Sequence, residues 1–111
     1  MPKMTFAQKW PQCWLCPSTF AVETHHIARG ANGRPNDECN LIRVCFRCHR
    51  KVETYPIAHQ IALVAYNNPD AYDRQRVNLL RNRSQDAVTE SQVKRYLKRI
   101  TKQAGQLLAA P

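Results

Sequence analysis

Residues 24–53 read THHIARGANGRPNDECNLIRVCFRCHRKVE, and this stretch decides the fold. It contains two adjacent histidines, an asparagine before an apolar run, and a Cys-x-x-Cys pair followed directly by a third histidine. A second Cys-x-x-Cys pair lies upstream. Paired cysteines are typical of closed zinc sites, whereas histidines also form open, reactive ones. The stretch therefore predicts two metal sites of different character, and with them metal-assisted hydrolysis.

The four paired cysteines predict a structural zinc site. Cys13 with Cys16, and Cys45 with Cys48, each enclose two residues, so both thiolates of a pair can turn onto one ion. Four thiolates complete a tetrahedral Zn²⁺ site with no open position. The zinc ion would hold together the ends of the 28-residue insert between the pairs. Binding in such a site contributes on the order of 10 kcal/mol to folding.

Two other uses of these cysteines remain open. The pairs could form two disulfides, although the N-terminus lacks the apolar core of a secretory signal and a reducing compartment favours metal ligation. The segment Cys45-Phe-Arg-Cys48-His49 also matches the pattern of c-type haem attachment, which leaves the upstream pair without a role. The fifth cysteine, Cys39, is expected in the core or in a loop and receives no role.

The composition describes a small basic chain. Its 111 residues, 43% of them apolar, suffice for one domain or for a small core with an extension. No run of 18 apolar residues occurs, so we expect no membrane span and a cytoplasmic location. The net charge of +9 is spread along the chain, with +4 in residues 1–53 and +5 in residues 54–111. This excess favours a polyanionic partner, and nucleic acid comes first.

The pattern of apolar and turn-forming residues predicts two strands and then helices. Residues 1–12 are expected to form an entry arm, and β-branched residues suggest a short strand within residues 20–28. Glycine and proline mark residues 29–37 as a loop. A second strand over Asn40–Cys45 leads to a helix that begins near Cys48 and stops at Pro56.

The remaining residues are helical by pattern. One helix is expected from Ile57 to Tyr66, and another from Asn68 to about Arg83, with Pro69 at its first position. Thr89-Glu-Ser-Gln92 is a capping-box signature for a last helix. That helix carries an apolar stripe of Val93, Leu97, Ile100, Ala104 and Leu107, and a basic face of Lys94, Arg95, Lys98, Arg99 and Lys102.

The histidines form a cluster with reactive chemistry. Adjacent residues of a strand point to opposite faces, so His25 and His26 are expected to do different work. One can bind a metal ion while the other acts from a neighbouring position. His49 begins a helix, and Glu53 lies four residues later on the same helical face. The fourth histidine, His59, is expected at the surface or in packing.

Residues 13–53 resemble the HNH endonuclease family and its ββα-metal fold. The resemblance rests on the two cysteine pairs, on His25-His26-Ile27, on the glycine loop, on Asn40-Leu41 and on His49. It implies an α+β fold with a small ββα-metal core braced by a structural zinc site of four cysteines. The expected division is a nuclease core over residues 1–55 and a helical, basic extension over residues 56–111, packed on or next to the core.

The resemblance also implies roles for single residues. His25 would be a ligand of the catalytic metal ion, His26 the general base, and Asn40 the brace of the loop that keeps His26 oriented. His49 would be the second ligand. Many family members carry a histidine where this chain has Glu53. A carboxylate there shifts the expected metal ion towards Mg²⁺ or Mn²⁺.

The function expected from these features is metal-dependent hydrolysis of DNA phosphodiesters, with contacts mostly to the DNA backbone. The expected contacts are Arg29, Arg34, Lys94, Lys98 and Lys102, and the last helix is also a candidate homodimer contact. Small nucleases of this type are frequent in phages and mobile elements, which would place the chain in a bacterial cytoplasm. Two alternatives remain: a non-catalytic zinc module that binds DNA or protein, and a nuclease directed at RNA.

Overall fold

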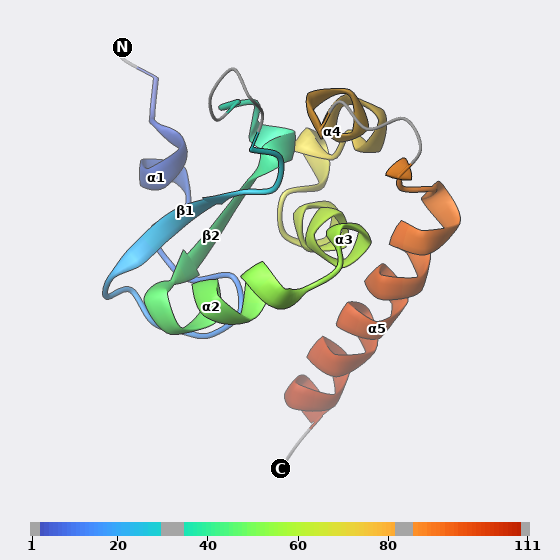
Figure 1. Cartoon of the computed structure of the whole chain (residues 1–111). Coiled ribbons are helices and arrows are strands. Elements are labelled where there is room, and N and C mark those ends of the chain that lie inside the picture. The colour runs from blue at the N-terminus through green and yellow to red at the C-terminus, as the bar shows by residue number, and fades with distance from the viewer. Residues whose placement is uncertain (1–2, 30–34, 82–85, 110–111) are drawn as a thin grey trace.

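The computed structural model describes residues 3–29, 35–81 and 86–109, the last four of these without their side chains. Figure 1 shows a two-stranded sheet at one side and a long helix at the other, with α3 between them. The elements, in chain order, are α1 (Phe6–Lys9), β1 (Val22–His26), η1 (Glu38–Asn40), β2 (Leu41–Cys45), α2 (Phe46–Thr54), α3 (Ile57–Asn67), η2 (Pro69–Ala71), α4 (Arg74–Arg81) and α5 (Glu90–Ala109).

The predicted ββα core is confirmed. β1 and β2 pair antiparallel, and His25 lies opposite Ile42 in the register. Every residue of β2 is buried, whereas burial along β1 varies. Because side chains alternate along a strand, Glu23 and His25 share one face of the sheet, and His26 lies on the other. β2 runs directly into α2, which packs against both strands.

The N-terminal arm contacts the sheet through Arg43. Its one helical turn, α1, was not predicted; Thr5 and Gln8 cap it reciprocally, at 3.1 and 2.8 Å. The buried Arg43 of β2 donates to the carbonyl oxygen of Trp10 at 2.8 Å and to the hydroxyl of Thr24 at 3.1 Å. These bonds tie the arm to the strand that carries the histidines.

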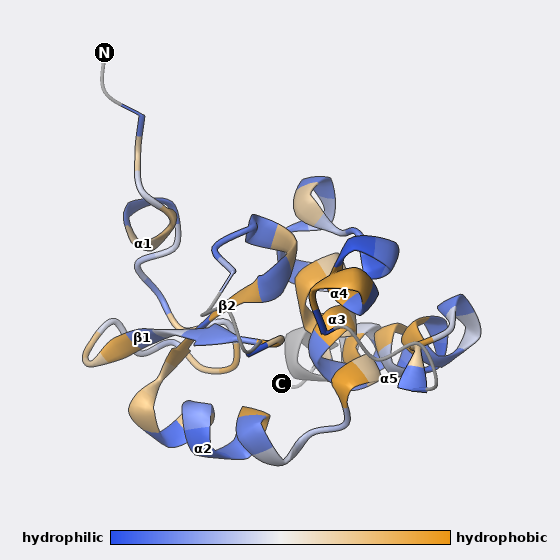
Figure 2. Ribbon diagram, turned by 45° about the horizontal axis from the view of Figure 1, so that its top comes forward, coloured by the Kyte–Doolittle hydropathy of each residue, from blue (hydrophilic) through white to orange (hydrophobic). Residues whose placement is uncertain are grey.

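The core continues from the sheet into the C-terminal half of the chain. Figure 2 shows the apolar character of α3, which lies between β2 and α5 and packs against both. Ile42 of β2, Val52 of α2 and Ile61 of α3 are essentially inaccessible to solvent. α5 contributes Val93, with Leu97 and Ile100 partly buried behind it. The extension is therefore joined to the sheet through one continuous apolar core.

One predicted helix is divided in the structure. The single helix expected from Asn68 to about Arg83 is instead the short η2 followed by α4. The chain is extended at Tyr72, and the carboxylate of Asp73 then accepts the backbone N–H of Arg76 at 3.0 Å. Aspartate is a strong N-cap, so Asp73 starts a new helix where the sequence pattern suggested a continuous one. Residues 82–85 lie outside the described part.

The capping box predicted for the last helix is confirmed. The Thr89 backbone N–H donates to Gln92 Oε1 at 2.9 Å, and the Gln92 N–H donates to Thr89 Oγ1 at 3.2 Å. The apolar stripe holds as far as Ala104, and the side chain of Leu107 lies outside the described residues. Among the described residues, none of the helices is both long enough and apolar enough to cross a bilayer.

Candidate functional site

The four paired cysteines meet at one point beside the strand-to-helix junction. Cys13 and Cys16 lie in the loop before β1, Cys45 ends β2, and Cys48 lies in the first turn of α2. Their sulfur atoms are all within 4.8 Å of one another, and Cys16 Sγ lies 3.6 Å from Cys45 Sγ. Sulfurs bound tetrahedrally at about 2.3 Å from a zinc ion are about 3.8 Å apart. The cluster therefore fits a closed zinc site.

The electrostatics of the cluster also favour a cation. The backbone N–H of Cys48, at the start of α2, lowers the pKa of Cys45 to about 7. Burial raises the pKa of the Cys48 thiol. Four sulfurs this close repel each other as thiolates unless a metal ion lies among them. All five cysteines lie in the described part of the chain and are free thiols, so the structure contains neither of the two disulfides considered above.

A second cluster joins His25 of β1 to His49 and Glu53 of α2. His25 Nδ1 lies 3.1 Å from His49 Nε2, which lies 3.3 Å from Glu53 Oε1. Two ligand atoms each 2.0–2.1 Å from one ion are about 3.0 to 3.4 Å apart. The spacing and the donor types therefore fit a divalent metal ion. Three ligands leave coordination positions free, which is typical of catalytic sites.

Each histidine of this cluster has its other ring nitrogen held by an oxygen atom. His25 Nε2 lies 2.7 Å from Gln60 Oε1, and His49 Nδ1 lies 3.1 Å from Glu23 Oε2. Such partners orient metal-binding histidines. Neither contact was predicted from the sequence. Glu23 precedes His25 by two residues on the same strand face and so left a signal in the sequence, whereas no local pattern around Gln60 points to His25.

The surroundings of His25 favour its neutral form. His25 is only 4% exposed, and this burial lowers the pKa of its imidazole. The hydrogen bond that His25 donates to Gln60 Oε1 raises the pKa, while the neighbouring His49 and the cation of Arg29 lower it further. A neutral imidazole is the form that binds a metal ion.

His26 and Asn40 lie on the loop side of the sheet. His26 Nε2 is 3.0 Å from Asn36 Oδ1, so Nε2 donates and Nδ1 is left to accept a proton. Asn40 is completely buried. It accepts the N–H of Ala28 at 2.7 Å and donates to the carbonyl oxygens of Ala28 and Pro35, at 3.2 and 2.9 Å. Asn40 thus ties the two ends of the loop, and its bond to Pro35 fixes the residue before Asn36.

The basic residues predicted to contact nucleic acid are spread over two surfaces. Arg29 is exposed and lies near His25, and Arg34 falls outside the described residues. Lys94, Lys98 and Lys102 are exposed on α5. The helix that carries His49 and Glu53 also exposes Arg47, Arg50 and Lys51, which the sequence analysis did not single out.

The two residues that received no catalytic role pack inside the fold. Cys39 is buried in the core, where burial raises its thiol pKa to about 11. His59 stacks between Tyr55 and Tyr96, with ring centroids 4.1 and 4.8 Å away. This stack joins the end of α2, α3 and α5.

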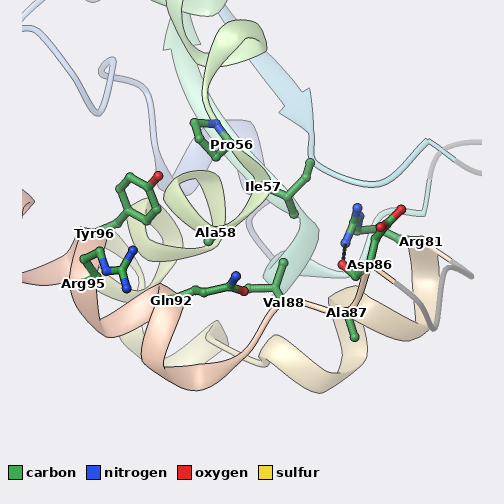
Figure 3. A pocket seen from close by; sticks show the side chains of 10 residues that line it. All are labelled: Pro56, Ile57, Ala58, Arg81, Asp86, Ala87, Val88, Gln92, Arg95 and Tyr96. Atoms are coloured by element: carbon green, nitrogen blue, oxygen red, sulfur yellow. Dashed lines mark hydrogen bonds between the residues drawn. The ribbon is translucent and has the colours of Figure 1, made fainter.

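A separate hollow lies where the start of α3 meets the segment before α5 (Figure 3). Pro56 and Ile57 line it on one side and Gln92 and Tyr96 on another. None of the site residues predicted from the sequence lines this hollow.

A comparison with family models matched residues 13–54 to the family described as HNH endonuclease. Comparisons with curated proteins and with solved structures gave no match. The matched segment contains both cysteine pairs and all three ligands of the second cluster. The gathered cysteines are consistent with the zinc-braced form of the family. Residues 13–54 are therefore similar to HNH endonuclease domains, which suggests a nuclease or DNA-binding function.

Proposed function

We propose that the protein is an endonuclease that hydrolyses DNA phosphodiester bonds with a divalent metal ion. The observation that carries this proposal is the convergence of His25 Nδ1, His49 Nε2 and Glu53 Oε1 within 4.8 Å of one another. A purely structural zinc module would have no need of this second, open set of ligands. The four-cysteine cluster would hold Zn²⁺ and the open set Mg²⁺ or Mn²⁺, because Glu53 adds a hard oxygen ligand.

The metal ligands, His26 and Asn40 have separate proposed roles. A divalent ion held by His25, His49 and Glu53 would supply positive charge that stabilises the phosphate and the leaving oxygen. His26 is the proposed general base, with Nδ1 taking a proton from the attacking water while Nε2 donates to Asn36. Asn40 contributes indirectly, because it closes the loop that places Asn36 beside His26.

DNA is the proposed substrate because the chain carries a net charge of +9 and contains an HNH domain. Arg29 lies near His25, and Arg47 and Arg50 are exposed on the helix that supplies His49. Contacts of this kind neutralise phosphates without reading bases. Affinity for DNA should therefore fall steeply as the salt concentration rises.

Plasmid nicking by the full chain tests the proposal. Wild type and His26→Ala are compared in chelator, in Mg²⁺ and in Mn²⁺, with His59→Phe as a matched histidine variant outside both clusters. We expect metal-dependent cutting that His26→Ala reduces by about 10²–10⁴-fold and His59→Phe leaves unchanged. Cutting that survives His26→Ala would remove His26 as the base. DNA binding without cutting in any metal would favour the non-catalytic module, and cutting of RNA alone would favour the RNA-directed nuclease.

A further inference from the structure

We propose that Gln60 is a positioning residue of the metal site: its amide fixes the tautomer of His25 so that the Nδ1 lone pair faces the metal ligands. The inference rests on the proposed function, because it takes His25 as a ligand. Gln60 lies on α3, beyond the matched residues 13–54. The open site would then be completed by the C-terminal half of the chain.

The orientation of the Gln60 amide is decided by its second partner. Gln60 Nε2 lies 3.0 Å from the carbonyl oxygen of Tyr55, and Gln60 Oε1 lies 2.7 Å from His25 Nε2. A carbonyl oxygen can only accept a hydrogen bond, so the NH₂ group must face Tyr55. The oxygen of the amide is therefore the atom that faces His25.

This orientation determines where the proton of His25 lies. Because Gln60 Oε1 only accepts, His25 Nε2 must carry the hydrogen. The other nitrogen, Nδ1, is then left with a lone pair, and it lies 3.1 Å from His49 Nε2. A neutral histidine with the opposite tautomer would present an N–H to the metal ion and could not bind it.

The surroundings of Gln60 make the contact strong and rigid. Gln60 is 4% exposed, whereas Glu23, the corresponding partner of His49, has 49% of its side chain exposed. Water can replace an exposed acceptor, but it does not reach a buried one as readily. Ala58 and Ile61 are buried apolar residues close to Gln60 in α3, and an unpaired amide there would be costly. Both polar ends of the side chain are satisfied, so α3 holds the amide in one position.

The test measures metal affinity and tautomer in the full, zinc-loaded chain, without DNA. Gln60→Leu removes the acceptor, Gln60→Glu keeps an acceptor oxygen, and Ile61→Val changes the next buried residue of α3 while leaving the Gln60 amide in place. Mn²⁺ affinity is measured by electron paramagnetic resonance, and the His25 tautomer by long-range ¹H–¹⁵N correlation in chain free of the second metal ion. Circular dichroism and zinc content verify folding.

We expect Gln60→Leu to weaken Mn²⁺ binding by about 10–100-fold and to lose the dominant Nε2–H form of His25. Gln60→Glu should recover most of the affinity, and Ile61→Val should bind as wild type does. Wild-type affinity and tautomer in Gln60→Leu would overturn the proposal. If Mn²⁺ affinity depends on Gln60 as expected but the wild type cuts no DNA, Gln60 keeps its positioning role and the proposed nuclease activity is refuted. A wild type that binds no Mn²⁺ would overturn both.

Discussion

The two candidate metal-binding clusters share one strand-to-helix junction but differ in donor atoms and in exposure. The sulfur cluster takes Cys45 and Cys48 from the end of β2 and the first turn of α2. The second cluster takes His49 and Glu53 from the same helix, one turn apart. Three of the four sulfur ligands are buried, whereas Glu53 has 51% of its side chain exposed. One junction thus supports a closed site and an open one.

The contrast between the closed and the open cluster indicates that stability and reactivity depend on different residues of this short chain. Four thiolates leave no position for a substrate, so a zinc ion bound there would contribute only stability. The open cluster has three ligands of mixed type and two hydrogen-bonded supports, Gln60 and Glu23. Losing a sulfur ligand should therefore destroy the fold, while losing a ligand of the open cluster should destroy only metal binding and cleavage.

The largest effect is expected from Cys48→Ser, which removes one sulfur from the closed site. Zinc binding of roughly 10–16 kcal/mol is folding free energy in sites of this type. We expect the variant to lose zinc and cooperative unfolding, as measured by metal analysis and thermal circular dichroism. Cys39→Ser, at a buried cysteine outside the cluster, is the control and should retain zinc. A Cys48→Ser variant that folds without zinc would show that the sulfur cluster is not needed for folding.

The next largest effect is expected from Asn40→Ala, which tests whether Asn40 stabilises the loop beside the open site. The side chain makes three hydrogen bonds from a fully buried position. Each buried backbone group left unsatisfied costs about 1–3 kcal/mol. We expect urea denaturation of the zinc-loaded variant to show a stability loss of that size or a few-fold larger, with zinc retained. An unchanged midpoint would show that the loop does not depend on Asn40.

A smaller effect is expected from Glu53→Ala. The side chain is half exposed, so the folding stability should hardly change. Affinity for Mn²⁺ should fall by at least about tenfold, the lower end of the effects seen for indirect partners of metal ligands. Isothermal titration of the zinc-loaded variant measures the affinity, and metal analysis verifies the zinc content. Glu90→Ala, at an exposed glutamate of α5, is the matched control. Equal affinity in the two variants would make Glu53 an ordinary surface residue.

The smallest effect concerns pH. Burial and the cation of Arg99 lower the pKa of His59 below 6.5, so the unfolded chain binds more protons than the folded one below that pH. Folding stability should therefore fall as the pH drops below about 6.5. His59→Phe keeps a ring between the two tyrosines and removes the titration. Between pH 7 and pH 5 it should lose less stability than wild type, as urea denaturation at the two pH values measures. Equal losses of folding stability in wild type and His59→Phe would show that the acid sensitivity comes from other residues.

Features that depend on local sequence patterns could be predicted, whereas contacts between residues distant in the chain could not. The cysteine pairs and the interval from His49 to Glu53 are local patterns, and the structure gathers both sets of residues as the spacing indicated. Gln60 is different, because its approach to His25 joins residues 35 positions apart through the packing of α3. No local pattern contains that information. The division of the helix expected over residues 68–83 depended on Asp73, whose capping role competes with the helical pattern around it.

The central claim is that the chain holds two metal ions with separable roles. Mn²⁺ binding to the zinc-loaded chain, measured by electron paramagnetic resonance for wild type and His49→Ala, tests it most directly. We expect one Mn²⁺ beside one zinc in wild type, and a His49→Ala variant that keeps zinc and fold but loses Mn²⁺. Mn²⁺ binding that survives His49→Ala, or zinc that is lost together with it, would contradict the account.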